Sequence, residues 1–148
     1  MKRDETVCFN IKTAWHAISR MYNEQGQEHE LSASIGYVLL NIDNQHGTPA
    51  TKIGPIIGME PKSLSRMLNS LEKDKLIYKE QDENDKRLSK IFLTEKGKEK
   101  RELARKAVKK FNQQIREEIP GQKLEIFFEV MQKINNILDQ KRNTETTF

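Results

Sequence analysis

Two short segments of the 148-residue chain hold the side chains best suited to chemistry. The first follows Gly58 and offers hydroxyl, amide and cationic groups, with the candidate contact residues Pro61, Lys62, Ser63, Ser65, Arg66 and Asn69. The second surrounds the charged run DENDK and adds Lys86, Arg87 and Lys90. Both segments are rich in hydrogen-bond donors and positive charge. Phosphate oxygens attract such cations, and both phosphate oxygens and the edges of DNA bases accept hydrogen bonds.

A helix is expected to present the first segment. Pro61 suits the first helical position because it has no backbone donor to lose. Apolar residues recur behind it at helical spacing, at Leu64, Met67, Leu68 and Leu71. On the outer face Arg66 can pair with guanine and Asn69 with adenine, and the Ser63 and Ser65 hydroxyls can reach phosphate or base edges. For any single one of these residues, ordinary solvent exposure of a polar side chain is as good an explanation as contact with a base. The whole set on one face favours double-stranded DNA as the binding partner.

A preceding helix is expected to cross this one closely. Gly54 supplies a small residue at the crossing and Gly58 permits the turn, as is typical of a helix-turn-helix. Pro55 removes a backbone donor inside the preceding helix, so we expect that helix to start late or to be distorted. Glu60, just before Pro61, can accept hydrogen bonds from the N-terminus of the second helix.

The second segment is predicted to be the tip of a β-hairpin with strands at 77–80 and 88–93. Lys86, Arg87 and Lys90 are expected to project beyond the strands, with Asp85 holding Arg87 in one orientation. A guanidinium at such a tip can enter a narrow minor groove and respond to its shape. The alternative is a solvated turn with a local ion pair between Asp85 and Arg87 that contributes little.

The remaining pattern predicts a mainly α fold with this small hairpin. Apolar spacing indicates helices over 5–23, over 35–42 after a cap at Ser32 or Ser34, from Thr94 to Pro120, and over 123–141, followed by a frayed tail, RNTETTF. Hydrophobic residues make up only 35% of the chain and charged residues 32%. A second copy of the chain is therefore expected to cover the outer helices, although their apolar stripes can also fold back on their own domain.

Charge is concentrated in the middle of the chain. Residues 51–110 contain 17 Lys and Arg against 10 Asp and Glu, a balance of +7, whereas the rest of the chain has 9 against 12. This asymmetry is typical of a polyanion-binding centre between assembly elements. The competing interpretation is the solvated face of a long charged helix.

Several classes of protein are disfavoured. The chain has one cysteine, no apolar run long enough to span a bilayer and no signal-peptide pattern, so a cytoplasmic, reducing location is expected. No paired nucleophile and base, phosphate-binding glycine loop or cofactor fingerprint is present, which argues against an enzyme and against a cofactor. His16, His29 and His46 are scattered, so no metal site is predicted.

The helix-turn-helix, the D-x-R element at Asp85-Lys86-Arg87 and the LTEKG segment from Leu93 to Gly97 together resemble the MarR family of bacterial transcription regulators. The resemblance covers nearly the whole chain. It implies a single domain over 1–148, with a winged helix-turn-helix at about 33–95 and dimerisation helices at about 5–23 and 96–141. It further implies a homodimeric repressor that reads a pseudo-palindromic operator, with Ser63, Ser65 and Arg66 on the recognition helix and Arg87 as the wing arginine.

The same resemblance implies release from DNA by a small phenolic or lipophilic effector bound in a cleft. The candidate lining residues are Trp15, Met21, Tyr22 and Tyr37, which are equally typical of plain core at helical spacing. A different class of function, a winged helix that binds an acidic protein surface, stays open as an alternative.

Cys8 raises a narrower alternative, because the VCF segment and Tyr22 fourteen residues later are similar to the peroxide-sensing branch of the family. Against this, Asp4 and Glu5 oppose ionisation of the thiol, and Ala33 stands where that branch supplies another tyrosine. A buried structural cysteine on the dimer stripe is the preferred interpretation, with redox sensing as the alternative.

Overall fold

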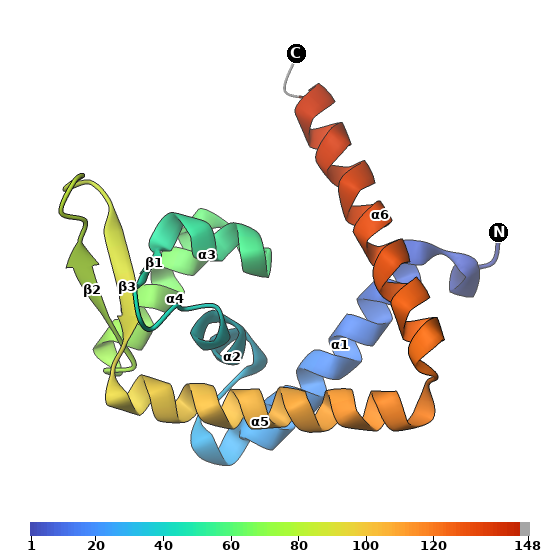
Figure 1. The fold of residues 1–148 in the computed structure, drawn as a ribbon, viewed down its shortest axis with the longest axis horizontal. Helices are drawn as coiled ribbons and strands as arrows, with labels where there is room; N and C mark the ends of the chain where they lie inside the picture. Colours follow the sequence, from blue (N-terminus) through green and yellow to red (C-terminus); the bar gives the residue numbers. More distant parts are fainter. Residues whose placement is uncertain (146–148) are drawn as a thin grey trace. The chain divides into compact units, whose positions relative to one another are not determined.

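A computed structural model describes residues 1–145 and shows a mainly helical protein with one small sheet (Figure 1). In chain order its elements are η1 (Arg3–Glu5), α1 (Val7–Gly26), η2 (Gln27–His29), α2 (Ala33–Leu40), β1 (Thr48–Pro49), α3 (Ala50–Ile57), α4 (Pro61–Lys73), β2 (Ile77–Gln81), β3 (Ser89–Leu93), α5 (Glu95–Glu118) and α6 (Gly121–Glu145). The chain forms two compact units, residues 1–108 and the residues from 109 onward, and α5 runs through the division. The predicted fold class is confirmed.

The sheet is antiparallel, with strand order β1-β3-β2. Its main hairpin pairs Ile77 with Leu93 at the base and Gln81 with Ser89 near the tip, so the predicted strands are right to within one residue. Strand β1 was not predicted, because two residues carry no alternating pattern that marks a strand. It pairs through Thr48 opposite Ile91 and includes a proline, which is tolerated at a sheet edge.

The core of the first unit lies where the helix pair meets the sheet. Its largest fully buried side chains come from α2, α3, α4, β2 and β3, namely Leu39, Ile53, Leu71, Ile77, Ile91 and Val38. On the other face of the hairpin, Tyr78 and Phe92 stack with ring centroids 5.3 Å apart and planes 12° from parallel. Alternation along the strands therefore separates an apolar inner face from an aromatic outer one.

Polar side chains set the helix starts as predicted at two places. The Ser32 hydroxyl accepts a hydrogen bond from the Ile35 amide at 3.2 Å, so Ser32, not Ser34, caps α2. The Thr94 hydroxyl accepts from the Gly97 amide at 3.0 Å and caps α5.

The first and the last α-helix, α1 and α6, both end later in the chain than predicted. Helix α1 continues to Gly26, because the Glu and Gln residues that follow Asn23 favour helix. Helix α6 continues to Glu145, so the predicted frayed tail is wrong for residues 142–145. The last three residues of that predicted tail, 146–148, lie outside the described part of the chain.

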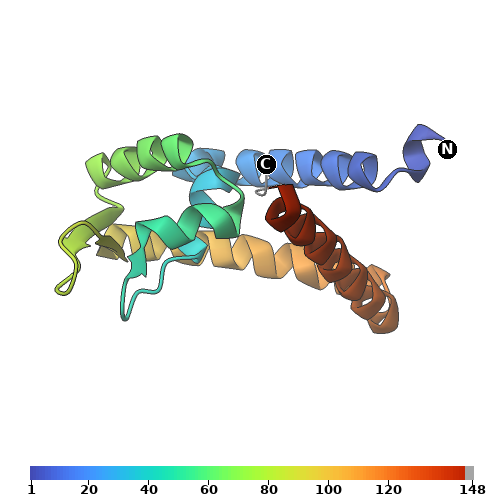
Figure 2. The same ribbon diagram turned by 90° about the horizontal axis from the view of Figure 1, so that it is seen from above.

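Helices α3 and α4 lie side by side across the turn at Gly58 (Figure 2). Gly58 has a φ of 68°, the left-handed conformation that glycine adopts freely, and its N–H donates to the Gly54 carbonyl. A Cβ on Gly54 would lie 3.0 Å from the Met59 carbonyl oxygen and 3.3 Å from Leu64 Cδ2, so the crossing leaves little room for a side chain there. Pro55 was expected to make this helix start late or to distort it; the late start is wrong, since α3 begins at Ala50 and includes Pro55. Thr51, whose carbonyl loses its helical partner, is exposed and can meet water.

Three basic side chains of α5 hold the ends of other elements. Lys96 Nζ donates to the Asp74 carbonyl at 3.2 Å, Lys100 Nζ to the His29 carbonyl, and Arg101 Nη1 to the Ile42 carbonyl at 3.2 Å. Asp74 is the C-cap of α4, His29 ends η2, and Ile42 follows the end of α2. Cations are favourable at helix C-termini because they meet unpaired carbonyls and the negative end of the helix dipole.

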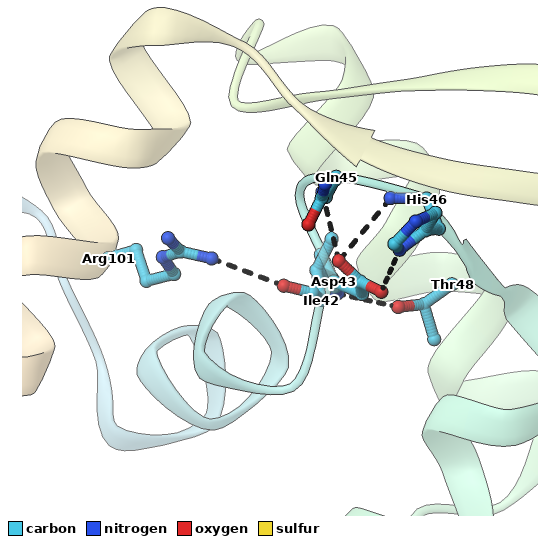
Figure 3. A network of polar contacts seen from close by, with 6 residues as sticks. All are labelled: Ile42, Asp43, Gln45, His46, Thr48 and Arg101. Atoms are coloured by element: carbon cyan, nitrogen blue, oxygen red, sulfur yellow. Dashed lines mark hydrogen bonds and ion pairs between the residues drawn. The ribbon is translucent and has the colours of Figure 1, made fainter.

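The loop between α2 and β1 is folded around Asp43 (Figure 3). One Asp43 carboxylate oxygen accepts from the amides of Gln45 at 2.9 Å and His46 at 3.3 Å, and the other lies 3.1 Å from His46 Nδ1. The Asp43 amide donates to the Thr48 hydroxyl at 2.7 Å. The hydrogen bond from the Gln45 backbone, followed by those from His46, lowers the pKa of Asp43, so the loop keeps its charged acceptor at neutral pH.

The second unit contains the end of α5 and helix α6. Leu124 is buried, but α6 exposes many large apolar side chains: Ile126, Phe127, Phe128, Val130, Ile137 and Leu138. Within residues 1–145, none of the helices combines the length and apolar character needed to cross a lipid bilayer.

The hairpin joins α5 by a very close approach of backbones. The Leu76 carbonyl accepts from the Thr94 amide at 3.1 Å, and a Cβ built on Gly97 would lie 1.9 Å from the same carbonyl oxygen. The Thr94 hydroxyl also donates to the Lys75 carbonyl at 2.6 Å. The base of the hairpin therefore fits against α5 only where a residue without a side chain stands.

We predict that Gly97→Ala lowers the free energy of unfolding by about 3 kcal/mol, because the added methyl forces the hairpin base away from α5. Urea unfolding at a fixed protein concentration would measure the change. Gly121→Ala is the matched control: its added methyl would meet no other element of the described chain within 4 Å, and its effect should stay within about 0.5 kcal/mol. Equal stability of the two variants would contradict the proposed close fit.

Candidate nucleic-acid interface

Helix α4 has one buried and one exposed face. Leu64, Leu68 and Leu71 are buried in the core of the first unit. The predicted contact residues are all exposed: Pro61, Lys62, Ser63, Ser65, Arg66 and Asn69. Lys62, Arg66 and Asn69 follow one another at intervals of four and three, which places them in one stripe along the helix. The exposed face thus combines two cationic groups with hydroxyl and amide donors.

The start of α4 differs from prediction in one detail. Glu60 is the N-cap residue, but its carboxylate makes no capping hydrogen bond. Its backbone carbonyl accepts from the Leu64 amide at 2.9 Å, and Pro61 occupies the first turn. A glutamate side chain is longer than the Ser, Thr, Asp and Asn side chains that fold back onto a helix start. The carboxylate of Glu60 is therefore left in solvent beside the exposed face.

Asn69 is tied to the hairpin. Its Oδ1 accepts a hydrogen bond from Lys79 Nζ at 2.9 Å, and the same ammonium lies 3.9 Å from a Glu72 carboxylate oxygen. Two-point pairing with adenine would require Asn69 to offer this oxygen to the base as well. The sequence pattern does not mark Lys79, because its partner Asn69 lies ten residues away and only the strand register brings the two together.

The hairpin tip presents Arg87 to solvent. The Arg87 side chain is 92% exposed, and its Nε lies 3.4 Å from Asp85 Oδ1, which also accepts the Arg87 amide at 3.0 Å. The predicted orienting role of Asp85 agrees with this geometry. An exposed, oriented guanidinium can contact an anionic groove.

The two lysines of the hairpin occupy different places. Lys86 is exposed at the tip, and its carbonyl accepts from Gln81 Nε2 at 3.3 Å. Lys90 lies within β3 opposite Glu80, and its Nζ is 4.0 Å from an Asp82 carboxylate oxygen. The expectation that Lys90 projects beyond the strands is wrong, because Lys90 is the second residue of β3 and its ammonium lies near Asp82.

A hollow of about 160 Å³ lies between α1, α2, the end of α3 and the turn after it. Its lining residues are Trp15, Ser34, Tyr37, Ile56, Ile57 and Met59. Trp15 and Tyr37 were predicted and meet edge to face, with ring centroids 5.2 Å apart. Met21 and Tyr22 do not belong to this lining. The sequence pattern does not mark Ile56, Ile57 or Met59 as lining residues.

The tyrosines near this hollow stay protonated at neutral pH. Burial raises the pKa of Tyr37, and burial followed by the nearby Tyr37 raises the pKa of Tyr22. A neutral Tyr37 hydroxyl can donate a hydrogen bond to a ligand inside the hollow.

Cys8 is exposed in the single chain, so the predicted burial would have to come from a second chain. Cys8 and Tyr22 belong to the same helix, α1, and fourteen residues separate them by about 21 Å along its axis. They cannot touch within one chain. Within residues 1–145, no three His, Cys, Asp or Glu side chains come together in a way that could hold a metal ion.

Comparison with known proteins supports a regulatory family. Residues 31–89 match the MarR family model. The chain is 32% identical over 94 residues to the HTH-type transcriptional regulator TtmR of Methylorubrum extorquens, a match covering 64% of this chain but only 48% of TtmR. It is 31% identical over 108 residues to the HTH-type transcriptional regulator SarZ of Staphylococcus aureus, covering 72% of this chain and 73% of SarZ. These relatives are regulators, not enzymes.

Solved structures show the same fold. A MarR/EmrR family transcriptional regulator from Acinetobacter sp. ADP1 superposes with a TM-score of 0.84 at 23% identity, over 95% of this chain and 99% of that one. The S. aureus MepR–DNA complex superposes with a TM-score of 0.81 at 20% identity, over 88% and 97%. The chain belongs to the MarR family of winged-helix DNA-binding transcription regulators.

Proposed function

We propose that the protein is a sequence-specific repressor that binds double-stranded DNA as a homodimer on a pseudo-palindromic operator and is released by a small effector. The observation that carries the proposal is the pairing of the exposed polar face of α4 with the exposed Arg87 of the hairpin, within one compact unit. A helix of this kind fits the major groove, and an arginine on an adjoining hairpin suits the minor groove.

The two surfaces are expected to divide the work of recognition. Arg66 is exposed on α4 and carries a planar guanidinium that can pair with guanine O6 and N7. Arg87 lies at a hairpin tip, where it can respond to the negative potential of a narrow minor groove without contacting specific bases. Base identity is therefore assigned to α4 and general affinity to the hairpin.

Dimerisation is supported by the apolar surface that a single chain exposes. Val7, Ile11 and Trp15 of α1 are between 38% and 56% exposed, and Phe127 and Phe128 of α6 are more than half exposed. A second copy would remove these side chains from water. The assignment of 5–23 and 96–141 to dimerisation, and of 33–95 to DNA binding, is part of the proposal. The two recognition helices would then reach successive major grooves, about 34 Å apart.

Release by an effector is supported by the hollow beside α3. Aromatic and aliphatic side chains line it, and Tyr37 offers a neutral donor, a chemistry that suits a small phenolic or lipophilic molecule. Because α3 leads directly into α4, a ligand that favours one arrangement of α1, α2 and α3 can shift the recognition helix.

Two other interpretations use the same residues. A winged helix that docks on an acidic protein would also use α4 and the hairpin, but it would not distinguish DNA sequences. A peroxide-sensing repressor would use Cys8, whose exposure leaves the thiol reachable by oxidant. A cytoplasmic location remains a prediction from the sequence.

We predict different consequences for the two arginines. Selection of duplexes from a random library should enrich an inverted repeat, and titration of its variants would measure specificity. Arg66→Ala should lower discrimination at one base pair of each half-site by about 1–3 kcal/mol. Arg87→Ala should weaken binding to all duplexes about equally and reduce the salt dependence.

Arg105→Ala is the control, because Arg105 is an exposed cation on α5, outside both surfaces. It should leave the preferred sequence unchanged. Failure of the wild type to enrich any sequence would favour the protein-docking alternative. Equal, sequence-blind losses from both arginine variants would contradict the division of labour.

We predict that Phe127→Glu shifts the protein from dimer to monomer, because a carboxylate would have to enter the apolar interface. Sedimentation equilibrium over a concentration series would detect the shift as a dissociation constant raised by about a hundredfold or more. Gln140→Glu places the same charge on the polar side of α6, near the line of Glu129, and should leave the dimer intact. A wild type that is monomeric at all concentrations would refute the dimer.

We predict that a small phenol such as salicylate changes the fluorescence of Trp15, the one tryptophan of the chain, which lines the hollow. Ile57→Trp would obstruct the hollow but add a second fluorophore, so ligand binding to this variant should be followed by calorimetry, and its affinity should fall about tenfold or more. Met21→Leu, outside the lining, should bind as the wild type does. An unchanged affinity of Ile57→Trp would place the effector elsewhere.

A further inference from the structure

The hairpin tip is organised around a carboxylate that sequence analysis did not select. Asp82 follows β2, and its side chain is 20% exposed. Its Oδ1 accepts hydrogen bonds from the Asn84 amide at 2.8 Å and the Asp85 amide at 3.3 Å. The Asp82 amide in turn donates to the Leu88 carbonyl at 2.9 Å. One residue therefore closes the loop through its backbone and shapes it through its side chain.

These bonds lead step by step to Arg87. Asp82 holds the amide of Asp85, and the Asp85 carboxylate accepts both the amide and the Nε of Arg87. The Leu88 amide donates to the Asp85 carbonyl at 3.0 Å, which closes the second half of the loop. Two consecutive turns, Asp82–Asp85 and Asp85–Leu88, thus link Asp82 to the guanidinium, and in each a carboxylate accepts hydrogen bonds from the backbone.

We propose that Asp82 is a positioning residue for Arg87 in DNA binding: it fixes the hairpin loop in the conformation that presents the guanidinium. This inference rests on the proposed function. In this proposal Asp82 does not contact DNA. It orders the loop before DNA binds, so that Arg87 loses less conformational entropy on binding.

The charge state of Asp82 suits this role. The hydrogen bonds from the Asn84 and Asp85 amides lower the pKa of its carboxyl group, with a smaller contribution from Lys90. The carboxylate is therefore ionised at neutral pH and makes charge-assisted bonds to the loop backbone. Lys90 Nζ, at 4.0 Å, is the cation that faces it from β3.

The sign of the charge makes the proposal testable. Asp82 is an acid on a surface that meets a polyanion, so its charge alone opposes binding. Removing it should tighten binding if charge is all that matters. Removing it should weaken binding if its role is to position Arg87. Glu83 is the matched control, since it is an exposed carboxylate in the same loop, and no described residue hydrogen-bonds its side chain.

The experiment measures affinity for the selected duplex at fixed salt with Asp82→Ala, Asp82→Asn, Glu83→Ala, Arg87→Ala and the double variant Asp82→Ala/Arg87→Ala. We expect Asp82→Ala to bind about tenfold more weakly, the scale of losing one ordered charged contact. Asp82→Asn keeps an oxygen acceptor and should recover most of the affinity. Glu83→Ala should bind as tightly as the wild type or more tightly. The double variant should bind no more weakly than Arg87→Ala, because Asp82 acts through Arg87.

Unfolding midpoints close to that of the wild type would show that the variants are folded. Binding by Asp82→Ala as tight as that by Glu83→Ala would overturn the inference, and so would losses that add in the double variant. A wild type without any sequence preference would instead overturn the proposed function. The two failures are thus distinguishable, since the second is seen before any variant is made.

Discussion

The donation of hydrogen bonds from α5 to the carbonyl ends of other elements is the interaction on which the rest of the first unit depends. Lys96, Lys100 and Arg101 lie within six residues of one helix, yet they reach the ends of α4, η2 and α2. Each of these carbonyls would otherwise lack a partner within its own helix. A single helix therefore satisfies the carbonyl ends of three other elements, including α4.

The base of the hairpin shows the same dependence on α5 through a different kind of contact. Thr94 caps α5 and also bonds the Lys75 carbonyl, while Gly97 allows the Leu76 carbonyl to approach the helix. Helix α4 and the hairpin are consequently fixed to one common element. The tip, in contrast, is shaped by its own carboxylates, so its conformation depends on local hydrogen bonds more than on the core.

The sequence predicted those features that depend on near neighbours. Ser32, Thr94, Gly58 and the pairing of Asp85 with Arg87 all act over two to four residues, a range in which residue type alone limits the geometry. Long-range features escaped prediction: strand β1, the bond from Lys79 to Asn69, and the lining of the hollow by the end of α3 and the turn after it. Lys90 was misplaced because its neighbour Asp82, eight residues earlier in the chain, draws its side chain back along the hairpin.

The shape of the sheet edge has a consequence for assembly. Strand β1 is only two residues long, and its Pro49 has no N–H to offer a neighbouring strand. At the other edge, β2 carries the charged pair Lys79 and Glu80, which disfavours pairing with a strand of a second sheet. Two hairpins held close together on one length of DNA would therefore have little tendency to join edge to edge. Exposed edge strands often cause aggregation when many copies of a protein are close together. A sheet with these two edges can be present at high local concentration without such pairing.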